Sequence, residues 1–359
     1  MRWVALKYVK PGFVLAQRVS DERGRTLLAQ GIVLSESYIR RLNRVGVRAV
    51  CIHDRATDDV IVNEMVAEPT KAELLTLTYD TLSELGSGHF SPKMKPTFLR
   101  KKLGPLLEDV IQQLREGNGA GEQLGSVYIA DGELFHHSVN VTFYVLTLGL
   151  YLNLPKDDLL NLGIGTLLHD VGKLRVRREV LQKPGRLTPE EFREIQMHSQ
   201  YGFEILSALA DISATSALIA LQHHERMDGS GYPNGLMGDQ IHLFSQLTAV
   251  VDVYEALTAN RVYRQAYLPH EAFGLIMRDR GTRLSTVGVD AFRETISIYP
   301  LGMSVRLTNG DLAVVIQASA GNDQQPVVRA IENARGEPIR PYELDLRNSP
   351  DIQIETCES

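Results

Sequence analysis

Hydrophobic residues recur at three- and four-residue spacing over most of the stretch from 121 to 298, a period that predicts helices rather than strands. The helical segments that this pattern predicts cover residues 141–154, 157–174, 188–209, 213–225 and 244–259. Prolines fall in the breaks between them, and Thr188 with Glu191 predicts a capping box at one helix start. The pattern therefore predicts a bundle whose helices present side chains to a shared core.

The first part of the chain, residues 1–66, has the pattern of a small α/β module. Short apolar runs are broken by turn residues at Pro11 and again at 21–24, which predicts strands. A helix is expected to begin near Ser35, and a strand to follow it over 48–54. We expect a regulatory or packing role for this module, because it carries no cluster of catalytic residue types.

Between the module and the bundle, residues 67–120 are predicted to form a helical connector. Thr70 with Glu73 predicts a capping box at its first helix. The tail from 299 to 359 instead alternates apolar and polar residues around Asn309-Gly310, which is a strong hairpin signal. An isolated hairpin is marginally stable, so we expect at least three strands there. The predicted fold is mainly α, with an N-terminal α/β module and a C-terminal β subdomain.

Composition narrows the class of protein. The chain has 359 residues, a net charge of −6 and two cysteines, Cys51 and Cys357, so neither a disulfide framework nor a thiolate metal cluster is expected. Its negative charge argues against binding a nucleic-acid polymer. There is no apolar run long enough to cross a membrane and no signal-peptide pattern at the start, which predicts a cytoplasmic protein.

Candidate chemistry centres on His223 and His224, which follow an apolar helical segment and lead into a loop rich in glycine and proline. Such a pair at the end of a helix suggests a metal site, although a hydrogen-bonded structural pair is about as common. His53 and Asp54 are also adjacent, yet no partners are evident for them, and we expect them on a surface turn.

Other imidazole and carboxylate side chains of the bundle favour the metal-site interpretation of His223 and His224. Asp252 ends an apolar run where a lone carboxylate would be costly to bury, and Glu133 with His137 share one helix face. Taken singly, most of these residues are more often structural. Taken together, they predict a polynuclear metal site with the ligands Glu133, His137, His169, Asp170, His198, His223, His224 and Asp252.

A donor set of imidazole and carboxylate without thiolate favours transition metals such as Fe or Mn. Two ions held close together supply a nucleophilic water and positive charge for phosphodiester hydrolysis, and Asp170 is the best candidate to bridge them. His136 points about 100° away from His137 on a helix, so we expect it in the core or behind the ligands.

Positive charge for a phosphate is available near the expected ligands. Lys173, one turn beyond Asp170, is a candidate phosphate contact or general acid, and a plain salt bridge to that aspartate is nearly as common. Arg261 and Arg264 lie three residues apart and are candidates for phosphate recognition, with a solvated helix face as the alternative.

The motifs HDVGK and HHERMDGSGYP resemble those of the HD-GYP family, a branch of the HD phosphohydrolases. The resemblance extends from about residue 124 to 295 and includes KPGRLTPEEF and LTANRVYR. It implies a bacterial signalling phosphodiesterase with an HD-type bundle that opens cyclic di-GMP to pGpG, and it leaves open whether hydrolysis continues to GMP. It also implies the metal ligands named above, with Asp170 as the bridge and Tyr232 in contact with a base or phosphate.

Family members hold two or three ions, and Glu133 favours three. This chain departs from the family at His242, at Gln246 in place of an arginine, at Glu255 in place of an aspartate, and at 284–286. We expect Glu255 to lie near the substrate pocket and the last change to alter only the start of a helix. Alternatives are a cyclic GMP-AMP phosphodiesterase or a weakly active cyclic-dinucleotide-binding module. The sequence leaves open the native metal, a homodimer and signalling-protein partners.

Overall fold

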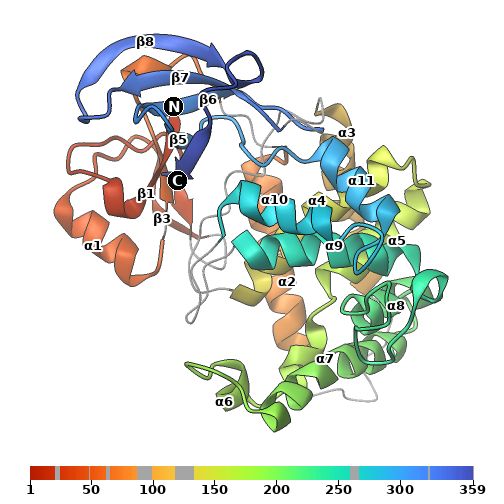
Figure 1. Ribbon diagram of the computed structural model, residues 1–359. Helices are drawn as coiled ribbons and strands as arrows, with labels where there is room; N and C mark the ends of the chain where they lie inside the picture. The colour runs from red at the N-terminus through yellow and green to blue at the C-terminus, as the bar shows by residue number, and fades with distance from the viewer. Residues whose placement is uncertain are drawn as a thin grey trace. The chain divides into compact units, whose positions relative to one another are not determined.

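The computed structural model describes residues 1–20, 25–47, 49–61, 65–86, 99–117, 133–258, 267–321 and 324–358, with the backbone alone at 86 and 133–135. The chain forms two compact units (Figure 1). One unit contains Met1–Ala72, Gly117–His136 and Arg293–Ser359, and the other contains Glu73–Glu116 and His137–Phe292. Both ends of the chain therefore belong to the same unit, and the predicted metal ligands other than Glu133 belong to the second.

The N-terminal part of the first unit is built from short strands and one helix. Its elements are β1 (Arg2–Ala5), β2 (Val19–Ser20), β3 (Thr26–Leu28), α1 (Glu36–Arg44) and β4 (Ala49–Ile52). Strand β1 pairs antiparallel with β4, and β2 pairs antiparallel with β3. The Ser35 hydroxyl accepts a hydrogen bond from the Tyr38 amide at 3.3 Å, which confirms the predicted helix start.

The C-terminal part of this unit is a five-stranded sheet in the order β8-β7-β6-β5-β9. Its strands are β5 (Ser304–Leu307), β6 (Leu312–Gln317), β7 (Val327–Glu332), β8 (Pro338–Asp345) and β9 (Ile354–Cys357). The hairpin predicted at Asn309-Gly310 joins β5 to β6, and Gly310 takes a φ of 88° that favours glycine. The expectation of at least three strands is confirmed.

The two ends of the chain are tied together by hydrogen bonds and ion pairs. The Trp3 amide donates to the Gly302 carbonyl at 2.8 Å. The buried Arg2 guanidinium contacts Asp54 at 2.7 Å and Ser304 Oγ at 3.3 Å. Our expectation that Asp54 has no partner was wrong, because its partner lies 52 residues away in sequence. In Figure 1 the N-terminal elements and the blue C-terminal strands accordingly lie side by side.

The second unit is a helical bundle, as predicted. The helices that form it or lead into it are α2 (Glu68–Gly86), α3 (Leu99–Glu116), α4 (Glu133–Tyr151), α5 (Lys156–Leu167), α6 (Arg178–Leu181), α7 (Pro189–Ser207), α8 (Ala214–Gln222), α9 (Leu243–Thr258), α10 (Pro269–Arg278) and α11 (Thr286–Thr295). Helix α8 packs against α5, α7 and α9, and α10 packs against α9. The capping box of Thr188 and Glu191 is present at the start of α7.

Two of the predicted helix boundaries were wrong. Helix α2 begins at Glu68, so Thr70 lies within its first turn rather than before it. Helix α5 ends at Leu167, whereas the apolar pattern predicted a helix through 174. His169 and Asp170 instead lie in a turn before the 3₁₀ helix η3 (Val171–Arg175).

Close packing explains why the chain leaves the helix at this point. A Cβ atom on Gly172 would lie 1.9 Å from the His198 carbonyl oxygen and 2.5 Å from the Gly202 amide nitrogen. The backbone of η3 therefore approaches α7 more closely than any residue with a side chain permits. This approach brings His169 and Asp170 beside His198.

None of the helices in the described part of the chain is both long enough and apolar enough to span a membrane. The subdivision of the chain at 66, 120 and 298 remains a prediction.

The Arg2 ion pair makes a testable contribution to the first unit. We expect Arg2→Ala to lower the free energy of unfolding of this unit by about 3 kcal/mol, because it leaves the partly buried Asp54 carboxylate without its cation. Arg40→Ala is the matched control, since Arg40 pairs with Glu36 on the surface and should change stability by less than about 0.5 kcal/mol. Urea denaturation of both variants checks this, and equal effects would contradict it.

Candidate metal centre

Five helical segments of the second unit bring the predicted ligands together. His137 lies on α4, His198 on α7 and Asp252 on α9. His169 and Asp170 lie in the turn between α5 and η3. His223 and His224 directly follow α8, at the predicted end of an apolar helix. Residues spread along more than a hundred positions thus converge on one buried centre.

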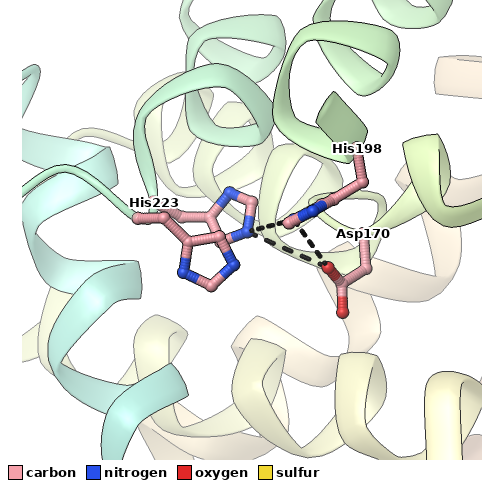
Figure 2. A group of neighbouring side chains, drawn as sticks. Asp170, His198 and His223 are labelled. Carbon is pink, nitrogen blue, oxygen red and sulfur yellow. Dashed lines mark hydrogen bonds and ion pairs between the residues drawn. The ribbon is translucent and has the colours of Figure 1, made fainter. Parts of the chain in front are cut away.

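The converging side chains form two groups, in each of which one donor atom per residue lies within 4.8 Å of the others. The first group is Asp170, His198, His223 and His224, and the second is His137, His169 and Asp252. Figure 2 shows three members of the first group, with the ring of His198 directed toward both Asp170 and His223. The geometry thus offers two adjacent positions for ions.

The Asp170 carboxylate lies between the two groups. Its Oδ1 atom is 3.4 Å from His198 Nε2 and 3.9 Å from His223 Nε2. Its Oδ2 atom is 3.5 Å from His169 Nε2 and 3.9 Å from His137 Nε2. Each oxygen therefore faces a different group, which is the arrangement that a bridging carboxylate requires.

Backbone carbonyls fix the orientation of three imidazoles. His169 Nδ1 lies 2.6 Å from the Thr166 carbonyl, and His198 Nδ1 lies 2.6 Å from the Ile195 carbonyl. His223 Nδ1 lies 3.0 Å from two carbonyls of α8. A carbonyl only accepts, so Nδ1 carries the proton in each ring and the Nε2 lone pair points into the centre.

The charges of the centre suit a cation. Burial lowers the pKa of His169, His198, His223 and His224, to about 3 for His223, so these rings are neutral near pH 7. Burial alone would raise the pKa of Asp170, but the positive charges of Lys173 and of protonated His137 hold it well below its usual range. An ionised carboxylate and inward lone pairs are the donor state that metals bind.

Two observations test whether these residues fit a metal. The Oδ1 atom of Asp170 is buried without a hydrogen-bond partner, although it carries negative charge. The Nε2 atoms of His198 and His223 are 3.3 Å apart, each presenting a lone pair to the other. A divalent cation would satisfy both features, and the set of imidazole and carboxylate donors is one that transition metals accept. The residues therefore fit divalent metal ions.

Glu255 has a role that the sequence did not reveal. Its carboxylate accepts a hydrogen bond from His137 Nδ1 at 2.6 Å, and His137 Nε2 is 3.2 Å from Asp252. We expected Glu255 near the substrate pocket, but it holds a metal-facing histidine. Its position three residues after Asp252 on α9, on the same helix face, was the available signal. A carboxylate behind a ligand histidine fixes the ring and strengthens it as a donor.

His137 differs from the other four imidazoles of the centre because its pKa is raised rather than lowered. Burial, the largest influence, lowers its pKa, but the charges of Glu255 and Asp252 and hydrogen bonds to both raise it to about 10. In the metal-free protein His137 is therefore an imidazolium at neutral pH. It must lose this proton before its Nε2 atom can bind a metal.

Glu225 was also missed by the sequence analysis. This buried residue accepts hydrogen bonds from the amides of Asn234 at 2.8 Å and Leu236 at 3.0 Å, and so fixes the loop after the histidine pair. The ring of Tyr232 in this loop lies 4.7 Å from that of His224. The loop thus places an aromatic residue against the metal-facing side chains.

Of the remaining residues singled out in the sequence, some are placed by the structure and others lie outside its described part. Lys173 Nζ lies 2.5 Å from Asp170 Oδ2 and is partly exposed, so the predicted salt bridge is present. His136 is buried and belongs to neither group, as expected. The side chain of Glu133 lies outside the described residues, as do Arg261 and Arg264.

The departures from the family's motifs have local structural roles. His242 Nδ1 accepts from the Phe244 amide at 3.2 Å, at the start of α9. Gln246 Nε2 donates to the Ile241 carbonyl at 2.8 Å. Ser285 Oγ accepts from the Gly288 amide at 3.0 Å, which confirms that the change there affects a helix start.

The segment that contains the centre is similar to known proteins. A family model described as an HD domain matches residues 110–285. The chain is 36% identical to a cyclic di-GMP phosphodiesterase of Pseudomonas aeruginosa over 218 residues, 60% of this chain and 52% of that protein. It is 30% identical to the cyclic di-GMP phosphodiesterase response regulator RpfG of Xanthomonas campestris over 231 residues, 64% of this chain and 61% of that protein.

A third relative acts on a different cyclic dinucleotide. The 3'3'-cGAMP-specific phosphodiesterase 3 of Vibrio cholerae is 34% identical over 164 residues, 46% of this chain and 35% of that protein. The chain spans little more than half the length of the first two relatives.

The protonation of His137 predicts how metal affinity depends on pH. Between pH 6 and 8 the proton competes with the metal, because the pKa of His137 is about 10. We expect the affinity for Mn²⁺ to rise about tenfold per pH unit, with release of about one proton per centre. Calorimetric titration in buffers of different ionisation enthalpy measures both quantities.

Glu255→Gln is the matched variant for this titration. It removes the charge that raises the pKa of His137 most strongly, so proton release should fall at the upper end of this pH range. An affinity that does not change between pH 6 and 8 in the unaltered protein would show that His137 is not a ligand.

Proposed function

Because this chain carries an HD domain over residues 110–285, we propose that it is a metal-dependent phosphodiesterase that hydrolyses cyclic di-GMP. The product is the linear dinucleotide pGpG, with GMP as the product of a second hydrolysis. Two relatives that are named cyclic di-GMP phosphodiesterases, 36% and 30% identical to this chain, support the substrate. We assign the protein to cytoplasmic second-messenger signalling in bacteria.

The position of Asp170 carries this proposal. Its two carboxylate oxygens face two separate groups of imidazole and carboxylate donors. A structural histidine cluster would pair its lone pairs with hydrogen-bond donors, whereas this cluster leaves Asp170 Oδ1 without one. Two adjacent ions, held by these two groups, would supply the charge needed for in-line attack on a phosphodiester.

We propose Fe or Mn as the native metal, because the donors combine imidazoles with carboxylates and include no thiolate. The two groups account for two ions. A third ion would need Glu133, which stands four residues before His137 in the sequence.

The proposed reaction needs contributions from both the metal ions and the side chains of this chain. When bound, the ions supply a water of lowered pKa and positive charge against the phosphoryl oxygens. Lys173 places an ammonium 2.5 Å from Asp170 and partly in solvent, where it would contact a phosphate oxygen or donate a proton to the leaving oxygen, which departs as a hydroxyl. We further propose Arg261 and Arg264, which lie outside the described residues, for phosphate recognition, and Tyr232 for contact with the nucleotide.

The metal mechanism is tested by changing the bridge. We expect Asp170→Asn to remove most bound metal and to lower kcat/KM for cyclic di-GMP by a factor of at least about 10³, because one carboxylate charge serves both groups. Metal analysis and chromatographic separation of pGpG and GMP measure the two effects. His53→Ala is the control, since this exposed histidine belongs to neither group. Full activity in Asp170→Asn would exclude the proposed mechanism.

Lys173 is tested separately from the ligands. We expect Lys173→Ala to retain the metals and to lower kcat about 10²-fold, as loss of a proton donor or transition-state contact does. Arg175→Ala is the neighbouring control, because Arg175 pairs with Glu204 on the surface. Loss of metal without a specific loss of turnover would mean that Lys173 is only the partner of Asp170.

Cyclic GMP-AMP is the second candidate substrate, favoured by the Vibrio cholerae relative that is named for it. Parallel assays with both cyclic dinucleotides decide between them. Tight binding of either compound without turnover in the metal-loaded protein would instead favour a signalling module that binds the ligand. Measurements of oligomeric state and of protein binding on the same preparations test the homodimer and the signalling-protein partners.

A further inference from the structure

Phe192 stands out among the exposed apolar residues because it belongs to a row of rings that starts at the metal centre. The ring of Tyr232 lies against that of His224, with centroids 4.7 Å apart and planes 30° apart. The ring of Phe192 lies 6.5 Å from that of Tyr232 in a T-shaped arrangement. The row therefore runs from a metal-facing imidazole to a side chain that is 48% exposed.

The T-shaped contact leaves part of Phe192 available. When two rings stand at 76°, the edge of one meets the face of the other, so Tyr232 covers at most one face of Phe192. A half-exposed phenylalanine gains less from burial than a core residue does. With 48% of the side chain exposed, the ring is accessible to a planar partner from solvent.

The ring contacts limit how far Phe192 lies from the metal centre, because centroid distances of 6.5 Å and 4.7 Å link it through Tyr232 to His224. Phe192 precedes His198 by six residues, which is about 9 Å along a helix axis. A nucleotide whose phosphate lies at the metal centre extends its base over a comparable length. A base directed from the metal centre toward the start of α7 would therefore reach the exposed part of the Phe192 ring.

The charges beside Phe192 are balanced and do not repel an anionic ligand. Glu191 is bound by Lys183 at 2.6 Å, and Glu194 is bound by Arg177 at 2.6 Å. Glu190, the third acidic residue beside Phe192, is bound by Arg193 at 2.9 Å, so each of the three is paired with a basic partner. The surface around the ring is open to a substrate that carries phosphates.

We infer that Phe192 is a stacking residue for one purine base of the substrate. This inference rests on the proposed function for the identity of that substrate. A phenyl ring contacts the face of a base and has no hydrogen-bonding group, so it adds affinity for purines without distinguishing guanine from adenine. The loss of Phe192 should therefore weaken cyclic di-GMP and cyclic GMP-AMP equally.

Binding of a mononucleotide tests the stacking role of Phe192 without requiring that the protein hydrolyse a substrate. Equilibrium dialysis of the Mn²⁺-loaded full chain with GMP and with ribose 5-phosphate separates the contribution of the base from that of the phosphate. We expect Phe192→Ala to weaken GMP about tenfold and to leave ribose 5-phosphate unchanged. Phe192→Tyr should retain GMP affinity, because it keeps the ring.

Two further variants separate stacking from support of the loop. Phe192→Leu keeps an apolar side chain beside Tyr232 but loses the flat face, so it should weaken GMP almost as much as Phe192→Ala does. Tyr151→Ala removes an aromatic residue of similar exposure, 50%, from the end of α4, and should change neither ligand. Equal weakening of GMP and ribose 5-phosphate, or unchanged GMP binding in Phe192→Ala, would overturn the inference.

Kinetics on the cyclic dinucleotides complete the test. Phe192→Ala should raise KM for both compounds by the same factor with little change in kcat, as expected for a contact made equally in the ground and transition states. An unaltered protein that binds GMP through Phe192 but turns over neither compound would refute the proposed function and retain the stacking site. Turnover that is unaffected by Phe192→Ala would refute the stacking site alone.

Discussion

A buried carboxylate surrounded by imidazole lone pairs is stable only if positive charge lies among them. Asp170 meets this condition in the described chain through Lys173 and the imidazolium of His137, and still leaves one oxygen without a donor. The hydrogen bonds from Nδ1 of three histidines to carbonyls prevent those rings from turning to relieve the conflict. The fold therefore holds negative charge and lone pairs close together without enough positive charge to balance them. Divalent ions can supply that charge, and the surrounding helices keep the donors in place.

The sequence predicted the parts of this structure that depend on local pattern. Helix period identified the bundle, and seven of the eight residues predicted as ligands lie in two adjacent groups, while their binding of metal stays a prediction. The eighth, Glu133, has no described side chain. These successes have a common cause, because a ligand motif and its helix face are both encoded within a few residues.

Contacts between distant segments could not be predicted in this way. Asp54 pairs with a residue 52 positions away, and Glu255 hydrogen-bonds to His137 across 118 positions. The break in the helix after Leu167 has the same origin, because it depends on how closely Gly172 approaches α7. Local propensity favoured a continuous helix there, and packing against a segment later in the chain overrode it.

The distribution of the ligands links metal binding to the stability of the second unit. They come from α4, α7 and α9 and from the turns that directly follow α5 and α8, so the centre forms only when these helices are already assembled. An ion that binds this folded arrangement and not the unfolded chain stabilises it in proportion to the logarithm of its free concentration. The first unit contributes none of the seven clustered ligands and lacks this source of stability. Metal loading should therefore raise the stability of one unit while leaving the other, with both ends of the chain, unchanged.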